Sequence, residues 1–335
     1  MKFIPQFIPY WDELEKKAVT KVLGRDYLNE HKTVREFEKK FAEFVGAKYC
    51  ITCTSGTTAL YLALKSTYDK NNPKKINIPD YAGIFVGNAC IQAGISPVLH
   101  DVSENGSFVS NKKPRFVVHS NGRLGSTQLL EDCAQAISHH TKNSISCYSF
   151  ASTKHITTSG QGGAICCDDQ KIFDVLSRLK DLGRNDRQNL KPMSDHFAFW
   201  GINSKFTEIQ AAFGLAQLKK LPKRLTRLNK MYKLVKDELK NTKEVDFFQD
   251  SPQWYIDILV KNPETLIQKL RKHGIQARRF YRPLHQQPLY KNKKNNFKNS
   301  NYLYEHGLWL PSTTNLSDKE LLYITNKIKI LLKNE

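Results

Sequence analysis

Three short segments of the sequence carry side chains that could do chemistry, and a lysine marks the first. Lys154 follows the apolar stretch Ser146–Phe150 and precedes the glycine-rich turn Gly160–Gly163. An amine between a strand and such a turn can lie in a cleft, where it could form a Schiff base with an aldehyde. The competing interpretation is one surface lysine among many, which the basic composition favours for any single lysine.

The second segment is Glu131–Ala136, in which Asp132 ends an expected strand. Open α/β sheets place ligand-binding groups at the carboxyl ends of their strands. A carboxylate in that place could pair with a protonated ring nitrogen. A helix N-cap is an equally good interpretation of Asp132 taken alone.

The third segment, Thr54–Thr58, lies between an expected strand and an expected helix and contains Gly56 and Thr57. Backbone N–H groups at the start of a helix, with small residues around them, suit a phosphate group. Serine and threonine are also common helix caps, and capping is the preferred interpretation of this segment on its own.

The elements that must position these segments are short strands alternating with helices, which predicts a mostly parallel α/β sheet. The expected strands are Tyr49–Cys53, Ile76–Ile78, Val98–Asp101, Phe116–His119, Leu129–Asp132, Ser146–Phe150 and Gly163–Cys166. The expected helices are Thr33–Val45, one that rests on Leu60, Ala63 and Leu64, and Ala82–Ala93. We expect the first helix to begin with a capping box of Thr33 and Glu36.

Beyond Gly201 the pattern changes to two long helices, Phe206–Leu218 and Leu225–Leu239, separated by Pro222. A smaller α+β unit follows, with expected strands Trp254–Val260 and Ile275–Arg279 and expected helices Thr265–Lys272 and Asp318–Leu332. The stretch Lys291–Asn301 is rich in lysine and asparagine and predicts a solvated loop. We therefore expect a large domain over residues 1–225 and a small C-terminal domain over residues 226–335.

The composition is typical of a soluble globular protein. The 335 residues are 40% hydrophobic and 25% charged, and 52 Lys and Arg against 32 Asp and Glu leave a net charge of +20, which favours an anionic partner. No apolar run is long enough to span a bilayer, and residues 1–17 lack a secretory apolar region, so we expect a cytoplasmic protein. The 7 cysteines are an odd number, so we expect buried strand thiols rather than disulfides, a metal site or a redox site.

The order of the motifs T-S-G-T-x-A-L, E-D-x-A-Q-A, S-F-x-x-x-K and G-x-G-G resembles the DegT/StrS family of pyridoxal-phosphate enzymes. The resemblance continues through Gly201–Ala212, Arg279–His285 and Leu310–Ser312, and so covers nearly the whole chain. It implies the aspartate-aminotransferase fold, with a large domain that binds the cofactor and a smaller α+β C-terminal domain.

The resemblance also implies roles for individual residues. Lys154 would hold pyridoxal 5′-phosphate covalently and, once released, would move a proton between substrate and cofactor. Asp132 would pair with the ring nitrogen, and Gln135 would lie near the ring hydroxyl. The cofactor phosphate would be held by Gly56, Thr57 and Ser149, together with Asn203 and Lys205 of a neighbouring subunit. A homodimer with shared active sites follows, and His285 would line the sugar-nucleotide pocket.

The reaction implied by the resemblance moves an amino group from L-glutamate to a keto sugar carried on a nucleotide diphosphate. The stretch Arg279–His285 is most similar to members that aminate C4 of a 4-keto-6-deoxyhexose, including perosamine synthases. A pathway to a surface polysaccharide is the expectation for the family.

Four features depart from the family pattern. Gly83 stands where an aromatic residue usually stacks on the cofactor ring, with Tyr81 or Phe85 as possible substitutes. Gln161 replaces an acid between the glycines, and Lys205 replaces an arginine and loses its bidentate geometry. Between two strands that should be parallel, only residues 120–128 replace the family's crossover helix, whereas such connections usually take about a dozen residues or more. Either the connection is rebuilt or the sheet is trimmed.

Three alternatives remain open. A related branch dehydrates sugars at C3 with the same cofactor and has a histidine in place of the lysine, whereas this sequence has Lys154 followed by His155. A catalytically idle relative would bind the cofactor without turnover. The net charge of +20 also suggests nucleic-acid binding, but the sequence contains no zinc-finger spacing, RNA-recognition motif or long basic helix.

Overall fold

The computed structural model describes residues 3–25, 27–67, 74–108, 116–126, 129–184, 197, 199–248, 252–290 and 296–333. Its main sheet has the strand order β1-β7-β6-β5-β4, and β2 of a two-stranded sheet β2-β3 lies beside β4. The strands are β1 (Tyr49–Cys53), β2 (Lys75–Pro79), β3 (Ser96–His100), β4 (Phe116–Val118), β5 (Leu130–Asp132), β6 (Ile145–Ser149) and β7 (Gly163–Cys167).

Most neighbouring strands of these sheets run parallel. The pairs β2–β3, β4–β5 and β5–β6 are parallel, whereas β7 is antiparallel to both β6 and β1. The predicted mostly parallel sheet is therefore confirmed, and β7 is the strand that departs from it. Because β5 and β6 are parallel, their carboxyl ends, Asp132 and Ser149, lie at the same edge of the sheet.

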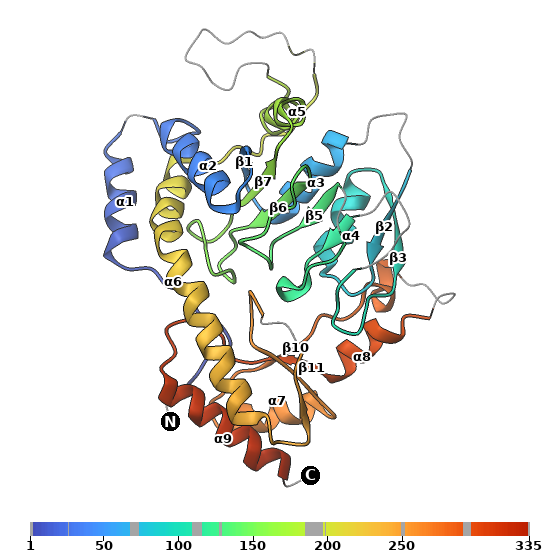
Figure 1. The fold of residues 1–335 in the computed structure, drawn as a ribbon. Helices are drawn as coiled ribbons and strands as arrows, with labels where there is room; N and C mark the ends of the chain where they lie inside the picture. Colours follow the sequence, from blue (N-terminus) through green and yellow to red (C-terminus); the bar gives the residue numbers. More distant parts are fainter. Residues whose placement is uncertain are drawn as a thin grey trace.

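Helices cover both faces of the main sheet, as Figure 1 shows. One face packs on α3 (Gly56–Thr67), α4 (Ile84–Gln92) and α5 (Gln170–Lys180), and the other on α2 (Lys32–Val45) and α6 (Glu208–Leu239). Successive strand residues contribute to opposite faces: Cys147 packs on the α3 side and Tyr148 on the α2 side. Strands buried on both faces are mostly apolar, which explains why several of these short runs can be recognised in the sequence.

The N-terminus of α2 is capped by a residue far away in the sequence. His31 is the N-cap and makes no side-chain capping bond, so the predicted capping box of Thr33 and Glu36 is wrong. Instead, the Glu208 carboxylate of α6 accepts hydrogen bonds from the backbone N–H groups of His31, Thr33 and Val34 at 3.0, 3.0 and 2.9 Å. A buried carboxylate with three such donors does the work of a local cap and also fixes α2 against α6.

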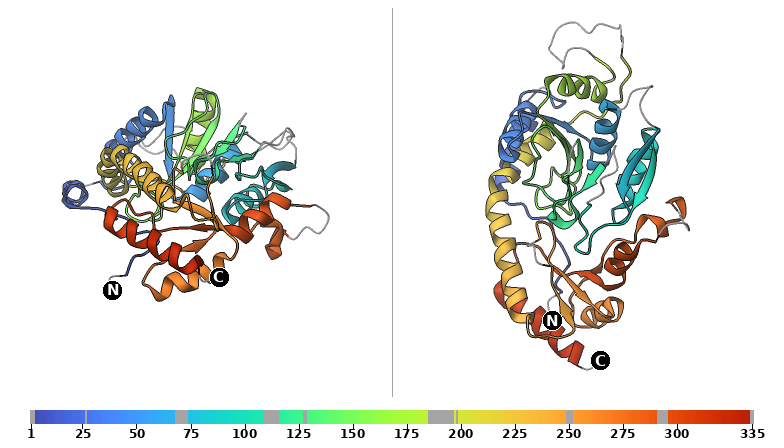
Figure 2. Two further views of the ribbon diagram at one scale, coloured as in Figure 1. Left: turned by 60° about the horizontal axis from the view of Figure 1, so that its bottom comes forward. Right: turned by 45° about the vertical axis from the view of Figure 1, so that its right-hand side comes forward.

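One unbroken helix, α6, replaces the two helices that were predicted on either side of Pro222. An interior proline costs about 3 kcal/mol relative to alanine. Packing on both sides offsets that cost, because Leu221 is buried in the core on the sheet while Leu228 and Met231 are buried in the core of the C-terminal unit. Figure 2 shows α6 running from beside the main sheet to the C-terminal helices. The helix crosses residue 225 without a break, and the domain boundary there stays a prediction.

The C-terminal unit is an antiparallel sheet with the order β10-β11-β9-β8. Its strands are β8 (Val245–Asp246), β9 (Asp257–Val260), β10 (Arg278–Arg279) and β11 (Gly307–Trp309). Its core also contains side chains of α6, α7 (Pro263–Lys272) and α9 (Asp318–Lys333). The predicted strand Trp254–Val260 is shorter than expected, because residues 254–256 pair with other parts of the molecule.

Several elements escaped prediction, among them α1 (Glu13–Leu23), α5 and α8 (Lys298–His306). The predicted solvated loop Lys291–Asn301 is wrong over its last residues, which begin α8, while residues 291–295 lie outside the described part of the chain. Ser300 is fully buried and donates both its N–H and its hydroxyl to Asp101, at 2.9 and 2.8 Å. A polar residue can thus be interior when a carboxylate satisfies it.

The connection between β4 and β5 is rebuilt, and neither of the two strands is lost. Phe116 pairs with Leu130 in a parallel register, so the sheet keeps both strands. The described residues of the connection, 119–126 and 129, contain a 3₁₀ turn at Ser120–Gly122 and no α-helix. Gln128, the end of the predicted short connection, lies outside the described residues.

All seven cysteines are buried and free, which confirms the predicted buried thiols. In the described ranges, every helix is too short or too polar to cross a membrane.

Candidate active site

A cavity of about 180 Å³ lies where β5, β6 and the start of α3 meet. Five of the residues predicted to bind the cofactor line it: Gly56, Thr57, Asp132, Ser149 and Lys154. These residues come from three separate segments of the chain, and the sheet brings them together because it places two strand ends and a helix start at one edge. A larger hollow of about 600 Å³ beside β3 has a mainly apolar lining and contains none of the predicted residues.

Lys154 is buried in this cavity, with its amine 4.1 Å from the centre of the Trp254 ring. Burial lowers the pKa of Lys154 to about 8, while the charge of Asp132 raises it and the charge of Arg278 lowers it further. A buried ammonium loses hydration, so proton loss becomes easier. The amine can therefore become a nucleophile or a base near neutral pH, as a Schiff-base lysine requires.

Asp132 is the acidic group of the cavity. Burial raises its pKa, against the opposing effects of a backbone hydrogen bond and of the charges on Lys154 and His119. The hydrogen bond comes from the N–H of Ala134 to Oδ1, at 2.9 Å. A carboxylate that is 3% exposed gains most from a cationic partner, and a protonated ring nitrogen would supply one.

The start of α3 lines one end of the cavity. Gly56 and Thr57 begin the helix, and the Ser55 hydroxyl accepts the Thr58 N–H at 3.1 Å. Capping and ligand binding are therefore compatible here: Ser55 caps the helix while the next two residues line the cavity. A Cβ at Gly56 would lie 2.7 Å from the Cβ of Ser149, so only glycine allows the helix start to approach the end of β6 this closely.

Of the two aromatic residues proposed as substitutes at position 83, Phe85 is the one that lies beside Gly83 and lines the cavity. A Cβ at Gly83 would lie 2.2 Å from Cε1 of Phe85, so the Phe85 ring fills the space next to this glycine. Phe85 and Tyr281 both line the cavity, with their ring centres 6.3 Å apart and their planes nearly perpendicular, at 86°. Tyr81, the other possible substitute, is buried against Phe280 outside the cavity lining.

Gln135 lies behind the cavity and not in its lining. Its Oε1 accepts the N–H of Asn121 at 2.6 Å, which leaves its Nε2 group to donate to a ligand. The predicted contact with a ring hydroxyl is compatible with this orientation and stays a prediction.

Asn203, Lys205 and His285 also lie outside the cavity lining. Asn203 is exposed, and the Lys205 amine pairs with Asp181 at 2.6 Å. The Nδ1 atom of His285 is 2.6 Å from Asp80, and its ring stacks on Phe297 with centres 4.5 Å apart. The roles predicted for these three residues remain predictions.

Sequence reasoning missed Trp254, which was interpreted as the start of a strand. Its ring contacts Lys154, and its indole N–H donates to the carbonyl of Thr153 at 2.9 Å. The signal in the sequence was weak: an adjacent aromatic pair, Trp254 and Tyr255, before an apolar strand.

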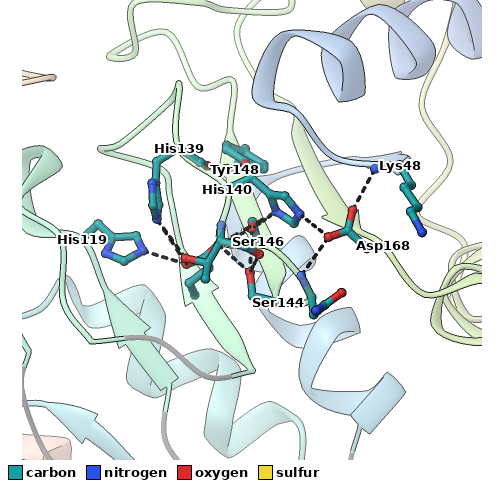
Figure 3. A network of polar contacts seen from close by, with 11 residues as sticks. Lys48, His119, His139, His140, Ser144, Ser146, Tyr148 and Asp168 are labelled. Atoms are coloured by element: carbon teal, nitrogen blue, oxygen red, sulfur yellow. Dashed lines mark hydrogen bonds and ion pairs between the residues drawn. The ribbon is translucent and has the colours of Figure 1, made fainter.

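A second polar cluster surrounds Glu131, which precedes Asp132 in β5 and therefore contributes to the opposite face of the sheet. Figure 3 shows this cluster, including His119, Ser144 and Ser146. The Glu131 carboxylate accepts the Thr141 N–H at 2.8 Å, the Ser144 hydroxyl at 2.7 Å and the His119 Nε2 at 3.0 Å, as well as the Ser146 hydroxyl. These bonds hold the pKa of Glu131 far below its ordinary value, although burial opposes them.

His119, Glu131 and His139 are close enough to suggest a metal site, since their ligand atoms lie within 4.8 Å of one another. The hydrogen bonds argue against that interpretation. His119 Nδ1 accepts the N–H of Gly125 at 3.1 Å, and Nε2, the atom that would bind the metal, faces Glu131 as a hydrogen-bond donor. The Glu131 oxygens are also fully engaged, and the cluster is better explained as a satisfied buried network.

Comparison with known proteins identifies the family. The model of the DegT/DnrJ/EryC1/StrS aminotransferase family matches residues 9–120 and 125–329. The chain belongs to this family. The family predicted from the motifs is thereby confirmed. The match is interrupted at residues 121–124, within the short connection between β4 and β5.

Members of the family and proteins of the same fold resemble the chain along its length. A GDP-perosamine synthase from Escherichia coli O157:H7 is 28% identical, with 98% of each chain covered. A GDP-4-keto-6-deoxy-D-mannose 3-dehydratase from Yersinia pseudotuberculosis is 22% identical over 80% of this chain and 82% of the relative. The solved structure of Helicobacter pylori PseC, an aminotransferase involved in the biosynthesis of pseudoaminic acid, superposes with a TM-score of 0.89 at 21% identity and 100% coverage of both chains. The predicted fold class is thereby confirmed.

Proposed function

We propose that the protein is a pyridoxal-phosphate aminotransferase that moves an amino group from L-glutamate to a nucleotide-linked 4-keto-6-deoxy sugar. The observation that carries the proposal is the meeting of Lys154, Asp132 and the start of α3 around one cavity. A nucleophilic amine, a buried carboxylate and an anion-binding helix start are the three groups that this cofactor requires.

The residues present fit the cofactor at both of its ends. Gly56 leaves room for the helix start to approach Ser149, which creates a cradle that any larger residue would fill. At the other end, Asp132 is a buried carboxylate that forms no close ion pair with a described residue, and its hydrogen bond comes from the neutral N–H group of Ala134. When bound, pyridoxal phosphate supplies an electron sink for the carbon that loses its proton.

The chain's own residues would hold the cofactor and move the proton. Lys154 would hold the cofactor at its aldehyde group and, once free, would carry the proton at its Nζ atom, for which a lowered pKa is suited. Asp132 would keep the ring nitrogen protonated, and Phe85 would offer the ring an apolar face. Gly56, Thr57 and Ser149 would bind the phosphate through N–H and hydroxyl groups.

The acceptor is proposed from the relatives. Those with the highest similarity include proteins named GDP-perosamine synthase, from Escherichia coli and Vibrio cholerae. The net charge of +20 suits a substrate that carries a diphosphate. We propose a role in a polysaccharide precursor pathway on the same grounds.

The proposal includes a homodimer located in the cytoplasm. Asn203 and Lys205 lie outside the cavity of their own chain, as residues that serve a neighbouring subunit must. Seven free cysteines suit a reducing compartment.

The test is the visible absorbance of the purified protein with pyridoxal phosphate, before and after L-glutamate, beside Lys154→Ala. We expect the bound cofactor's band in the wild type to convert to the amine form with glutamate, and the variant to show no conversion. Addition of a nucleotide-linked 4-keto-6-deoxy sugar should then restore the first band and yield an aminated sugar. A deoxygenated sugar without nitrogen would instead identify a 3-dehydratase, and cofactor binding without conversion would identify an idle relative.

A further inference from the structure

The short connection between β4 and β5 carries a residue with unusual contacts. Asn121 lies in the left-handed region, with φ of 53° and ψ of 28°, and belongs to the four residues that interrupt the family match. Its side chain is 3% exposed and pairs with the backbone of Tyr255 in both directions, at 2.9 Å each. Its Nδ2 also donates to Asp257 at 2.6 Å. Asn121 therefore binds both the residue that leads into β9 and the first residue of β9, which are 134 and 136 residues away.

Two further contacts strengthen this attachment. The carbonyl of Asn121 accepts the N–H of Gln253 at 3.0 Å. Arg123, from the same connection, donates to Asp257 at 2.7 Å, and its guanidinium lies 3.8 Å from the centre of the Phe248 ring. The described residues of this connection form a 3₁₀ turn and no crossover helix, and this turn holds the segment Gln253–Asp257.

The other side of the same segment faces the reactive lysine. The Trp254 indole and the Tyr255 hydroxyl both donate to the carbonyl of Thr153, at 2.9 and 3.0 Å. The Trp254 carbonyl accepts a hydrogen bond from His155 Nε2 at 2.5 Å. Burial lowers the pKa of His155 to about 4, so this ring is neutral at physiological pH and Nε2 carries its proton. Trp254 thus forms hydrogen bonds with Thr153 and His155, the two residues that flank Lys154 in the sequence.

The indole ring contacts the amine itself. Nζ of Lys154 lies 4.1 Å from the ring centre, well inside the range of a cation–π contact. Trp254 is 2% exposed, so the contact is shielded from water, where such contacts are strongest. Lys154 also forms no ion pair with any described residue. The ring is therefore the side chain best placed to fix the position of the amine.

We propose that Trp254 is a positioning residue for the Lys154 amine, and that Asn121 in the rebuilt connection holds it in place. This inference rests on the proposed function, because a fixed amine matters only if Lys154 is the reactive lysine. The same asparagine donates its N–H to Gln135. The turn at Asn121 is thereby bonded both to Gln135, the residue expected near the ring hydroxyl, and to the segment that carries Trp254, the residue that holds the amine.

Three variants test the proposal. Trp254→Leu removes the aromatic face, Trp254→Phe keeps a ring but loses the indole N–H, and Asn121→Gly keeps the left-handed backbone without the side-chain hydrogen bonds. Tyr323→Leu is the matched control, because Tyr323 of α9 makes a similar contact with Lys327, at 5.6 Å, in the C-terminal unit.

The first readout needs no cofactor: the rate at which a small acylating reagent labels Lys154 at pH 7, followed by peptide mass spectrometry. Loss of the ring exposes the amine and removes a contact that favours its charged, unreactive form. We expect about tenfold faster labelling in Trp254→Leu, a smaller increase in Asn121→Gly, and rates within about threefold of the wild type in Trp254→Phe. Tyr323→Leu should label Lys154 at the wild-type rate.

The second readout is the single-turnover conversion of the bound cofactor by L-glutamate. We expect the maximal rate to fall about tenfold in Trp254→Leu with the half-saturating glutamate concentration unchanged, and Trp254→Phe to recover most of it. The proposal would be overturned if Trp254→Leu, confirmed as folded by circular dichroism, labelled Lys154 and converted the cofactor at the wild-type rates. If the wild type itself fails to react with glutamate, the proposed function fails, while the labelling comparison still decides whether Trp254 controls the amine.

Discussion

Gly56 and Ser149 lie so close together that a Cβ added to the glycine would be 2.7 Å from the serine Cβ. The contact joins the start of α3 to the end of β6 and therefore sets the width of the cavity at the end where we propose that the phosphate binds. We expect Gly56→Ala to push these two elements apart and to destabilise the fold by about 1–3 kcal/mol, as overpacking does.

The Gly56→Ala variant should also bind pyridoxal phosphate more weakly, by about tenfold or more, because the helix N–H groups move away from the phosphate. Absorbance titration and thermal unfolding measure the two effects. Gly24→Ala is the control, since the nearest atom to its added Cβ is 3.8 Å away. Equal cofactor affinity in the two variants would rule out the assigned phosphate end.

The lowered pKa of Lys154 predicts the pH dependence of covalent cofactor capture. Only the neutral amine attacks the aldehyde, so the capture rate of the cofactor-free protein should rise with pH and level off above about 8, rather than above the ordinary value of 10.5. The charge of Asp132 raises the pKa of the amine, so Asp132→Asn should move the midpoint to lower pH. Stopped-flow absorbance across pH 6–10 provides the measurement; a midpoint near 10.5 contradicts a buried amine.

Asp132→Asn should separate cofactor capture from turnover. Lys154 remains in place, so we expect covalent capture to persist. The ring nitrogen loses its anionic partner, so the glutamate reaction should slow by about 100-fold or more. Asp246→Asn, at an exposed residue of the C-terminal unit, should leave both steps unchanged. A fast glutamate reaction in Asp132→Asn would show that another group supports the ring.

Substitutions of Phe85 and of Tyr81 should have opposite effects on cofactor binding and thermal stability. Phe85 lines the cavity, so Phe85→Leu should weaken cofactor binding by about tenfold with little effect on thermal stability. Tyr81 is buried against Phe280 instead, so Tyr81→Leu should lower the melting temperature and leave cofactor affinity unchanged. Reversed results would mean that Tyr81 and not Phe85 replaces the missing aromatic residue.

The Glu131 network predicts sensitivity to acid. In the folded protein the pKa of Glu131 lies far below its ordinary value of 4.5. The ionised carboxylate therefore contributes its full stabilisation of the fold above pH 4.5, and this contribution is lost as the pH falls below 4.5. Glu131→Gln should lower the free energy of unfolding by about 1–3 kcal/mol at pH 7 and should flatten the acid limb of the stability curve. Denaturant unfolding at several pH values tests this, and an added chelator should not change the wild-type result if the cluster holds no metal.

Local patterns predicted much of the sheet, and strand β1 was predicted at its observed bounds. The five cavity residues were named through the resemblance to the DegT/StrS family, which rests on short motifs of neighbouring residues. The failures involve partners that are distant in the sequence. Glu208 replaces the expected local cap of α2, and Asp101 makes Ser300 an interior residue.

Trp254 escaped prediction for the same reason. Nothing near it in the sequence indicates that Asn121 and Thr153 will hold its segment beside Lys154. The break expected at Pro222 was wrong because burial on both sides of the proline outweighs one lost hydrogen bond. Each of these features depends on tertiary packing, which a local sequence pattern does not show.

The unbroken α6 also determines how the molecule can deform. Two parts joined by a loop can rotate relative to each other freely, whereas two parts joined by a continuous helix can do so only if the helix bends. Pro222 is its softest point, because the ring removes the donor to the Leu218 carbonyl and leaves the helix easiest to bend there. Any movement of the C-terminal unit relative to the main sheet would therefore have to bend α6, and the bend would centre on Pro222.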